Sequence, residues 1–187
     1  MSKVTYSFSV SADGFINDAS GSLGWAQIDE EIHTWFNDRA READAFLYGR
    51  RLWETMAAYW PDAATDGDAS PAMLDFARIW NAKPKVVFSS TLESVEHGAR
   101  LERGPILDAL ARLREEFPGE LEVGGAALAA DLVQGGLIDE YRLVVHPVAL
   151  GAGTPFFPPL DAPLHLRLVE SRPFASGAVL LRYEPSR

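Results

Sequence analysis

Hydrophobic and polar positions along the chain follow two periods, one typical of strands and one typical of helices. Residues 3–11 alternate with period two and are rich in β-branched and aromatic side chains, which predicts a strand. Ile32, Trp35 and Phe36 fall on one stripe of a helix predicted from residue 29, where three acids suit a helix N-terminus. The chain therefore begins with a strand followed by a helix.

The same two patterns continue along the chain. Further strands are predicted at residues 43–49, 83–90, 99–104, 121–123 and 137–148, with a hairpin over 164–184. Further helices are predicted at residues 50–59, 71–80, 105–117 and 124–134. Residues 12–24 and 60–71 are predicted loops, the second being acidic and the expected mobile segment. Strands that alternate with helices indicate a mixed α/β sandwich, which we interpret as a single domain over residues 1–187.

Composition and charge narrow the classes of function. The net charge of −10 repels a polyanion, so we expect no nucleic-acid partner. No apolar run approaches the roughly 20 residues of a membrane span, and the N-terminus lacks a signal-peptide pattern, so we expect a cytoplasmic protein with no membrane partner. The absence of cysteine excludes thiol catalysis and thiolate metal sites. The four histidines lack metal-binding spacing, so we expect no metal.

Gly124 and Gly125 stand where a short apolar strand passes into a helix. Free amides at a helix N-terminus bind phosphate, and missing β-carbons let a pyrophosphate approach the backbone. A tight strand-to-helix turn favours the same glycines, so this segment by itself leaves both interpretations open. The stretch GAGTPF, from Gly151 to Phe156, lacks the third glycine of a dinucleotide fingerprint and is interpreted as a loop.

Two other strand ends carry groups that suit an anion. Gly49 precedes a predicted helix that begins with Arg50 and Arg51, and guanidinium groups match phosphate geometry, although solvated surface arginines are the alternative. Ser89 and Ser90 end another predicted strand, where paired serines also commonly cap a turn. Because ligands of open α/β sheets gather at the carboxyl ends of strands, the three weak signals together favour a nucleotide site.

Five ordered motifs cover nearly the whole chain: DGFI, LYGRRLWE, KVVFSSTL, VGGAALAADL, and the most specific one, GLIDEYRLVVHPVALGAGTPF from Gly136 to Phe156. In this order they resemble the dihydrofolate reductase superfamily. More closely, they resemble the branch that contains the reductase domain of the riboflavin-biosynthesis deaminase–reductase. The resemblance implies a three-layer sandwich, with helices on both faces of a central mixed, mostly parallel sheet and antiparallel strands at the C-terminal end.

The resemblance also implies an NADPH-dependent reductase and favours a homodimer. By match of motif, the cofactor-binding residues would be Ser9, Ile16, Gly49, Arg50, Arg51, Ser89, Ser90, Val123, Gly124, Gly125 and Ala126. Gly124 and Gly125 would contact the pyrophosphate, and Arg50 would lie near the adenosine 2′-phosphate. The phosphate interpretation of the glycine pair is therefore favoured over the turn.

Two positions depart from the pattern of dihydrofolate reductases. Leu52 stands where they carry a threonine hydroxyl, so one cofactor hydrogen bond, worth about 1 kcal/mol, is missing or comes from another group. Ile32 stands where they carry the carboxylate that grips the pterin and helps deliver a proton. Glu31 or Asp29, or a bound water, would supply the proton instead, the alternative role of these acids being to cap the helix. Folate reduction itself is not expected.

The expected reaction is hydride transfer from C4 of NADPH to a small heterocyclic substrate that is pterin- or pyrimidine-like. Trp25, Phe36, Tyr48 and Trp53 are expected to form walls for a flat substrate, ordinary core positions being the alternative. One alternative function is a non-catalytic nucleotide-binding or regulatory protein that keeps the reductase fold. Another is reduction of a ribosylamino-pyrimidine, although the lack of cysteine indicates that no zinc deaminase domain is fused here.

Overall fold

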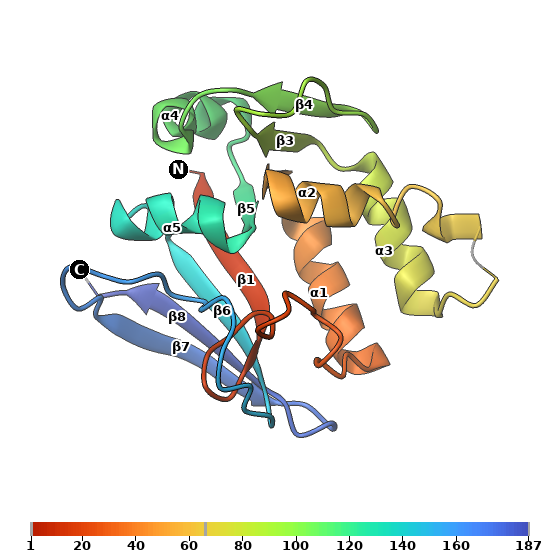
Figure 1. Cartoon of the computed structure of the whole chain (residues 1–187), viewed down its shortest axis with the longest axis vertical. Helices are drawn as coiled ribbons and strands as arrows, with labels where there is room; N and C mark the ends of the chain where they lie inside the picture. The colour runs from red at the N-terminus through yellow and green to blue at the C-terminus, as the bar shows by residue number, and fades with distance from the viewer. Residues whose placement is uncertain (1, 66, 187) are drawn as a thin grey trace.

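One mixed β-sheet forms the centre of the computed structural model, which describes residues 2–65 and 67–186. Its strand order is β4-β3-β2-β5-β1-β6-β8-β7 (Figure 1). The strands are β1 (Lys3–Ser11), β2 (Ala45–Gly49), β3 (Lys85–Phe88), β4 (Ala99–Glu102), β5 (Glu120–Gly124), β6 (Glu140–His146), β7 (Leu166–Pro173) and β8 (Val179–Pro185). The strands from β4 to β6 in this order are parallel, whereas β8 runs antiparallel to both β6 and β7. The predicted mixed, mostly parallel sheet is confirmed.

Helices occupy the connections between the parallel strands, except the connection from β3 to β4. They are α1 (Glu30–Glu42), α2 (Arg50–Ala57), α3 (Pro71–Ala82), α4 (Ile106–Glu116) and α5 (Ala126–Gln134). A short 3₁₀ helix, Ala63–Thr65, lies within the stretch 60–71 that was predicted to be a loop, and residue 66 of that stretch lies outside the described residues. None of the helices in the described ranges is long and apolar enough to span a membrane.

Local sequence explains where the first helices begin. The Asp29 side chain accepts a hydrogen bond from the amide of Ile32 and caps α1, and two further acids follow in the first turn. The Ser70 side chain caps α3 in the same way, and Pro71 occupies the first helical position, where its missing N–H costs nothing. The acids at the start of α1 therefore stabilise the beginning of this helix, which is the alternative role that the sequence pattern offered for them.

Helices cover both faces of the sheet and give the predicted three layers (Figure 1). One face packs against α4 and α5 through a core that includes Tyr6, Leu47 and Val123. The opposite face packs against α1 and α3, through smaller clusters that include Phe46 and Val144. Because side chains of a strand alternate between faces, residues 5, 7, 9 and 122 point to the side of α1.

The carboxyl ends of β1, β2, β3 and β5 meet at one edge of the sheet. The loop after β1 crosses this edge and is held by the loop that follows β6. The Asp13 carboxylate accepts hydrogen bonds from the amides of Leu150 (3.0 Å) and Gly151 (2.7 Å), and the Ile16 amide donates to the Thr154 carbonyl (2.8 Å). The GAGTPF stretch is thus a loop, as predicted, and it positions the loop after β1.

Candidate functional site

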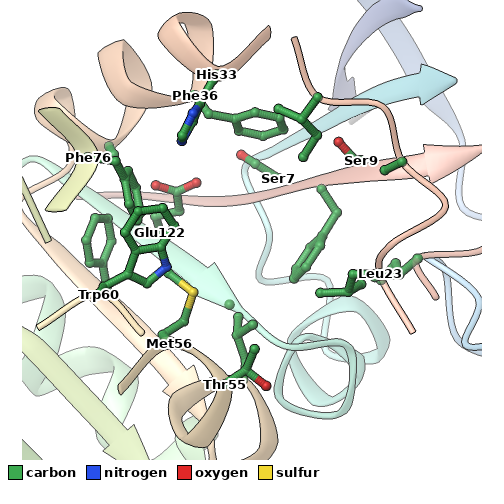
Figure 2. A pocket seen from close by; sticks show the side chains of 18 of the residues that line it. Ser7, Ser9, Leu23, His33, Phe36, Thr55, Met56, Trp60, Phe76 and Glu122 are labelled. Carbon is green, nitrogen blue, oxygen red and sulfur yellow. The ribbon is translucent and has the colours of Figure 1, made fainter. Parts of the chain in front are cut away.

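A cavity of about 610 Å³ opens on the α1 side of the sheet, beside the carboxyl ends of β1 and β5. Its floor is formed by strand residues, among them Ser7, Ser9 and Glu122. Its walls come from α1, α2, α3 and the loop after β1, and they are mostly apolar. Figure 2 shows these side chains around the cavity. A concave, largely apolar site with few polar groups is typical of small-molecule binding.

Aromatic side chains from three helical segments line one end of the cavity. Phe36 comes from α1, Phe76 from α3, and Trp60 from the segment after α2. The rings of Trp60 and Phe76 lie edge to face with their centroids 4.5 Å apart. His33 lies 6.2 Å from each of these two rings, and burial lowers the pKa of its imidazole, so His33 is neutral at pH 7. This end therefore suits a flat ring.

Glu122 is the one carboxylate among the described residues that line the cavity. Burial raises the pKa of the Glu122 carboxyl from an ordinary value of 4.5 to about 7, although the positive charge of Arg142 acts in the opposite direction. In Figure 2 the carboxyl group lies between the rings of Phe76 and Trp60 on one side and the Ser7 hydroxyl on the other. A carboxyl group with such a pKa can give or take a proton near neutral pH.

Arg142 is held behind the cavity floor by two other acids. Its guanidinium binds Glu120 through two hydrogen bonds of 2.8 and 2.9 Å and Glu140 through one of 2.5 Å. Lys3 and Arg182 also bind Glu140, so three cations and two carboxylates pair in this partly buried network. The Arg142 guanidinium is bound to Glu120 and Glu140. It therefore lowers the pKa of the Glu122 carboxyl less than a cation paired directly with Glu122 would.

At the edge of the sheet, the N-termini of α2 and α5 lie side by side. Gly49 caps α2 and Gly125 caps α5, and a β-carbon built on Gly125 would lie 3.6 Å from the Gly49 nitrogen. Neither cap has a side-chain hydrogen bond, and neither helix has an acid in its first turn. This arrangement contrasts with α1, whose start is capped and acidic. Two adjacent helix starts of this kind could bind an anion such as a pyrophosphate.

The two predicted pyrophosphate glycines also have structural reasons to be glycine. Gly125 has φ +105°, which side chains rarely adopt. A β-carbon at Gly124 would lie 2.7 Å from both Leu52 and Tyr48. Leu52, which replaces the expected threonine, thus packs against the glycine turn and lines the cavity. The tight-turn and phosphate interpretations therefore describe the same backbone and do not exclude each other.

Beyond this turn, polar groups from α2 and the end of β3 face each other. The Arg50 guanidinium donates a hydrogen bond to Thr91 (2.8 Å) and pairs with Glu54 (2.7 Å). The Ser89 hydroxyl accepts hydrogen bonds from the amides of Thr91 and Leu92, which is the turn-capping role considered for it. Ser90 follows directly after Ser89, and Arg51 is exposed on the first turn of α2. The Thr91 hydroxyl, which was not among the predicted cofactor-binding residues, also belongs to this group because it binds Arg50.

The structure brings most of the predicted site residues to this region. Those that line the cavity are Ser9, Ile16, Val123 and Gly124 of the predicted cofactor site, and Trp25, Phe36 and Tyr48 of the predicted substrate site. Gly49, Gly125 and Ala126 lie at the two helix starts. Trp53 is not among the lining residues: it is buried and stacked on Trp80, with 5.8 Å between ring centroids. The core alternative therefore holds for Trp53, because its side chain packs against Trp80 of α3.

The two predicted acids do not line the cavity. Glu31 is partly exposed and accepts hydrogen bonds from the Ala175 amide (3.0 Å) and from Arg172 (2.9 Å), contacts that lower the pKa of its carboxyl. Asp29 caps α1. The physical reason is the direction of the helix: α1 points residue 32 into the core, so its neighbour at residue 31 points toward β7. The acid that faces the cavity comes from β5 instead.

Sequence reasoning missed Glu122, although a signal was present. In the stretch ELEVGG, Glu120 and Glu122 alternate with Leu121 and Val123, so both acids point to one face of a strand. That strand lies between β2 and β1 in the middle of the sheet, where both faces are covered. An acid in a central strand either belongs to a buried ion pair, as Glu120 does, or faces a cavity, as Glu122 does.

Comparison with known proteins places these features in a family. Residues 2–180 match the model of the RibD C-terminal domain. The uncharacterized protein YyaP of Bacillus subtilis is 31% identical over 182 residues, covering 97% of this chain and 94% of that protein. A putative riboflavin biosynthesis protein from Shewanella has a similar structure, with a TM-score of 0.78, 24% identity and full coverage of both chains. Dihydrofolate reductase from Enterococcus faecalis, complexed with NADP(H) and RAB-propyl, matches with a TM-score of 0.68 and 15% identity over 99% of this chain and 97% of that one. The fold is therefore that of dihydrofolate reductases, and the chain belongs to the RibD C-terminal domain family.

Proposed function

We propose that this protein is an NADPH-dependent reductase that transfers a hydride to a small, pyrimidine- or pterin-like heterocycle bound in the cavity. The observation that carries the proposal is the pair of uncapped helix starts at Gly49 and Gly125, directly beside the cavity. A dinucleotide bound along this edge of the sheet would have its pyrophosphate at the helix starts. The family membership and the dihydrofolate reductase fold support the same placement.

The residues present fit such a cofactor along its length. Ser9, Ile16 and Gly124 would contact the nicotinamide end, because they line the cavity near the ends of β1 and β5. Gly49 and Gly125 would hold the pyrophosphate, and Arg50 with Ser89 and the neighbouring Ser90 would face the adenosine end. When bound, NADPH would supply a hydride from C4 of the nicotinamide.

Selection of NADPH over NADH depends on Arg50 in this proposal. Its guanidinium already binds Thr91, beside the Ser89 hydroxyl, and its second partner is Glu54, an exposed residue one turn along α2. A 2′-phosphate carries more charge than the Glu54 carboxylate and matches the arginine fork. We expect Arg50 to exchange Glu54 for the 2′-phosphate when NADPH binds, whereas NADH offers it no such partner.

The test is a titration of the purified protein with NADPH and with NADH, followed by quenching of tryptophan fluorescence, since Trp25 and Trp60 line the cavity. Wild-type protein is expected to bind NADPH more tightly than NADH. Arg50→Ala is expected to weaken NADPH binding by about tenfold to a hundredfold, which corresponds to loss of a charge-assisted hydrogen-bond pair. The affinity for NADH is expected to change little.

A suitable control is Arg167→Ala. Arg167 is exposed on β7, at the opposite edge of the sheet, where it pairs with Glu184. The Arg167→Ala substitution removes the same charge as Arg50→Ala but lies away from the proposed site, so it should leave the affinities for NADPH and NADH unchanged. If neither nucleotide binds to the wild-type protein, the reductase function is wrong and the fold serves another purpose.

A further inference from the structure

The charges of the cavity are unusual for a site that would receive a phosphorylated substrate. Among the described residues that line it there is one carboxylate, Glu122, and there is no lysine or arginine. The other titratable groups of the lining are His33, which is neutral at pH 7, and the phenols of Tyr48 and Tyr59. Arg50 lies outside this lining, at the start of α2, where it pairs with Glu54 and Thr91.

We propose that the cavity selects a flat, apolar and weakly basic nitrogen heterocycle that carries no phosphate or carboxylate, and that Glu122 binds a ring nitrogen of this molecule. The inference rests on the proposed function for the role of the site and narrows the class of its substrate. It also assigns the acid of the site to β5 and not to the N-terminal end of α1.

Shape supports a flat ring. Phe36, Trp60 and Phe76 present aromatic surfaces to the cavity that holds Glu122, and Met56 lines it beside Trp60 (Figure 2). Aromatic walls bind planar rings through offset or edge-to-face contacts, and the flexible Met side chain adapts to the outline of the ring. In this setting a carboxylate with two acceptor oxygens can bind a ring N–H and an adjacent exocyclic amine together.

Charge supports a weak base. The groups that act on the pKa of the Glu122 carboxyl are Arg142 from β6, Glu120 from its own strand, the Ser7 hydroxyl from β1, and Lys83 from the end of α3. Arg142 is committed to Glu120 and Glu140, while Lys83 binds the carbonyls of Arg41 and Ala43. Neither cation therefore pairs directly with Glu122, and a protonated ring nitrogen would supply the missing partner.

The same charges oppose an anionic substrate. A phosphate in this apolar cavity would leave water without gaining a cationic partner, and it would face Glu122, which is partly ionised at pH 7. Buried charges without partners are strongly disfavoured in proteins. A ribosyl phosphate attached to the ring would thus have to remain outside the cavity, and the described residues of the lining include no arginine or lysine to hold it there.

The experiment uses three probes and isothermal titration calorimetry at pH 7, with the protein free of nucleotide. The first probe is 2-aminoquinoline, a flat weak base with an amine beside its ring nitrogen. The second is 2-aminonaphthalene, which has nearly the same shape and amine but lacks the ring nitrogen. The third is quinoline-2-carboxylate, which keeps the ring nitrogen and adds a negative charge.

We expect wild-type protein to bind 2-aminoquinoline about tenfold or more tightly than 2-aminonaphthalene, the ratio expected for one charge-assisted hydrogen bond. Quinoline-2-carboxylate should bind more weakly than either. In Glu122→Gln the preference for 2-aminoquinoline should disappear, while the affinity for 2-aminonaphthalene should stay the same. Glu31→Gln, which removes the acid predicted from the sequence, should retain the full preference.

The inference is overturned if wild-type protein binds the two amines equally, if the preference survives in Glu122→Gln, or if quinoline-2-carboxylate binds as tightly as 2-aminoquinoline. The wild-type comparison decides the matter even if Glu122→Gln does not fold. Because the probes are measured without nucleotide, the result is independent of the cofactor titration. Binding of NADPH without a Glu122-dependent preference would leave the reductase proposal standing and reject the substrate class. A Glu122-dependent preference without binding of NADPH would support the substrate class and reject the reductase proposal.

Discussion

Glu31 and Arg172 form an ion pair, with 2.9 Å between Oε1 and Nη2, that joins the beginning of α1 to β7. The second carboxylate oxygen of Glu31 accepts a hydrogen bond from the Ala175 amide in the turn after β7. The acid that the motif comparison indicated as a proton donor thus has a structural role at the surface. Among the described residues that line the cavity, the one with a carboxylate is Glu122.

Glu31→Gln is therefore expected to leave cofactor and ligand affinities unchanged. It should lower the melting temperature slightly, because an exposed ion pair contributes little to stability. Thermal unfolding and NADPH titration of the same preparation measure both effects. A large loss of nucleotide or ligand binding would return Glu31 to the site.

Glu122→Gln should change how stability depends on pH. The folded-state pKa of Glu122 is about 7 and lies above its ordinary value of 4.5, so the folded state binds more protons between these values. The free energy of unfolding of the wild-type protein should therefore contain a term that decreases as pH rises from 4.5 to 7. At pH 8 the Gln variant should be more stable than wild type by up to about 3 kcal/mol, and at pH 4 this advantage should be absent.

Urea unfolding of both proteins at a series of pH values measures this difference. Only the difference between the two proteins is informative, because other groups titrate in both. A gap in stability that stays constant from pH 4 to pH 8 would contradict the raised pKa of Glu122.

Gly125→Ala tests the glycine turn, with Gly136→Ala as its control. Both glycines have positive φ, +105° at the start of α5 and +65° just beyond its end. Each substitution should destabilise the fold by about 1 to 3 kcal/mol because alanine disfavours these conformations. Only Gly125→Ala should also weaken NADPH binding, since only Gly125 lies beside Gly49. Equal nucleotide affinities in the two variants would argue against a pyrophosphate at this turn.

Arg142→Met should be strongly destabilising. The substitution leaves Glu120 and Glu140 in the buried network with fewer partners, and removing one member of a buried ion pair costs about 3 to 5 kcal/mol. Arg167→Met, which breaks the exposed pair with Glu184, should cost less than about 1 kcal/mol. Denaturant unfolding at pH 7 compares the two. Similar losses in both would show that the network behind the cavity floor contributes little.

Gly153→Ala tests how the GAGTPF loop holds the loop after β1, and Gly151→Ala is its matched control. A β-carbon at Gly153 would lie 1.8 Å from the Asn17 carbonyl oxygen, whereas one at Gly151 would meet nothing within 4 Å. The control should cost about 1 to 2 kcal/mol for its positive φ. Gly153→Ala should cost more and should also weaken ligand binding, because the displaced loop carries Ile16 of the cavity wall. Thermal unfolding and probe titration measure these two effects, and equal behaviour of both variants would contradict this role.

Much of the fold follows from local pattern. The alternation of residues 3–11, the apolar stripe after residue 29 and the glycines at strand ends predicted strands and helices close to those observed. The two glycine-containing strand ends were also predicted to share one edge, because the carboxyl ends of parallel strands meet there. The predictions of a homodimer and of a cytoplasmic location stay predictions.

The places that individual side chains occupy in the fold could not be predicted from the local pattern. Trp53 and Trp60 are both aromatic and lie seven positions apart, yet Trp53 stacks on Trp80 in the core and Trp60 lines the cavity. A local pattern gives the face of a helix, but it does not say whether that face meets another helix or an open space. Only the packing of α1, α2 and α3 over the sheet leaves that space.

The sequence by itself determined the class of fold, the family motifs and the edge of the sheet at which we expect an anion to bind, because these depend on neighbouring residues and on strand direction. The tertiary structure decided that β5 lies between β2 and β1, so that Glu122 faces the cavity from the floor while Glu31 pairs with Arg172 at the surface. It also raised the pKa of Glu122, since desolvation arises from residues that are distant in the chain and close only after folding.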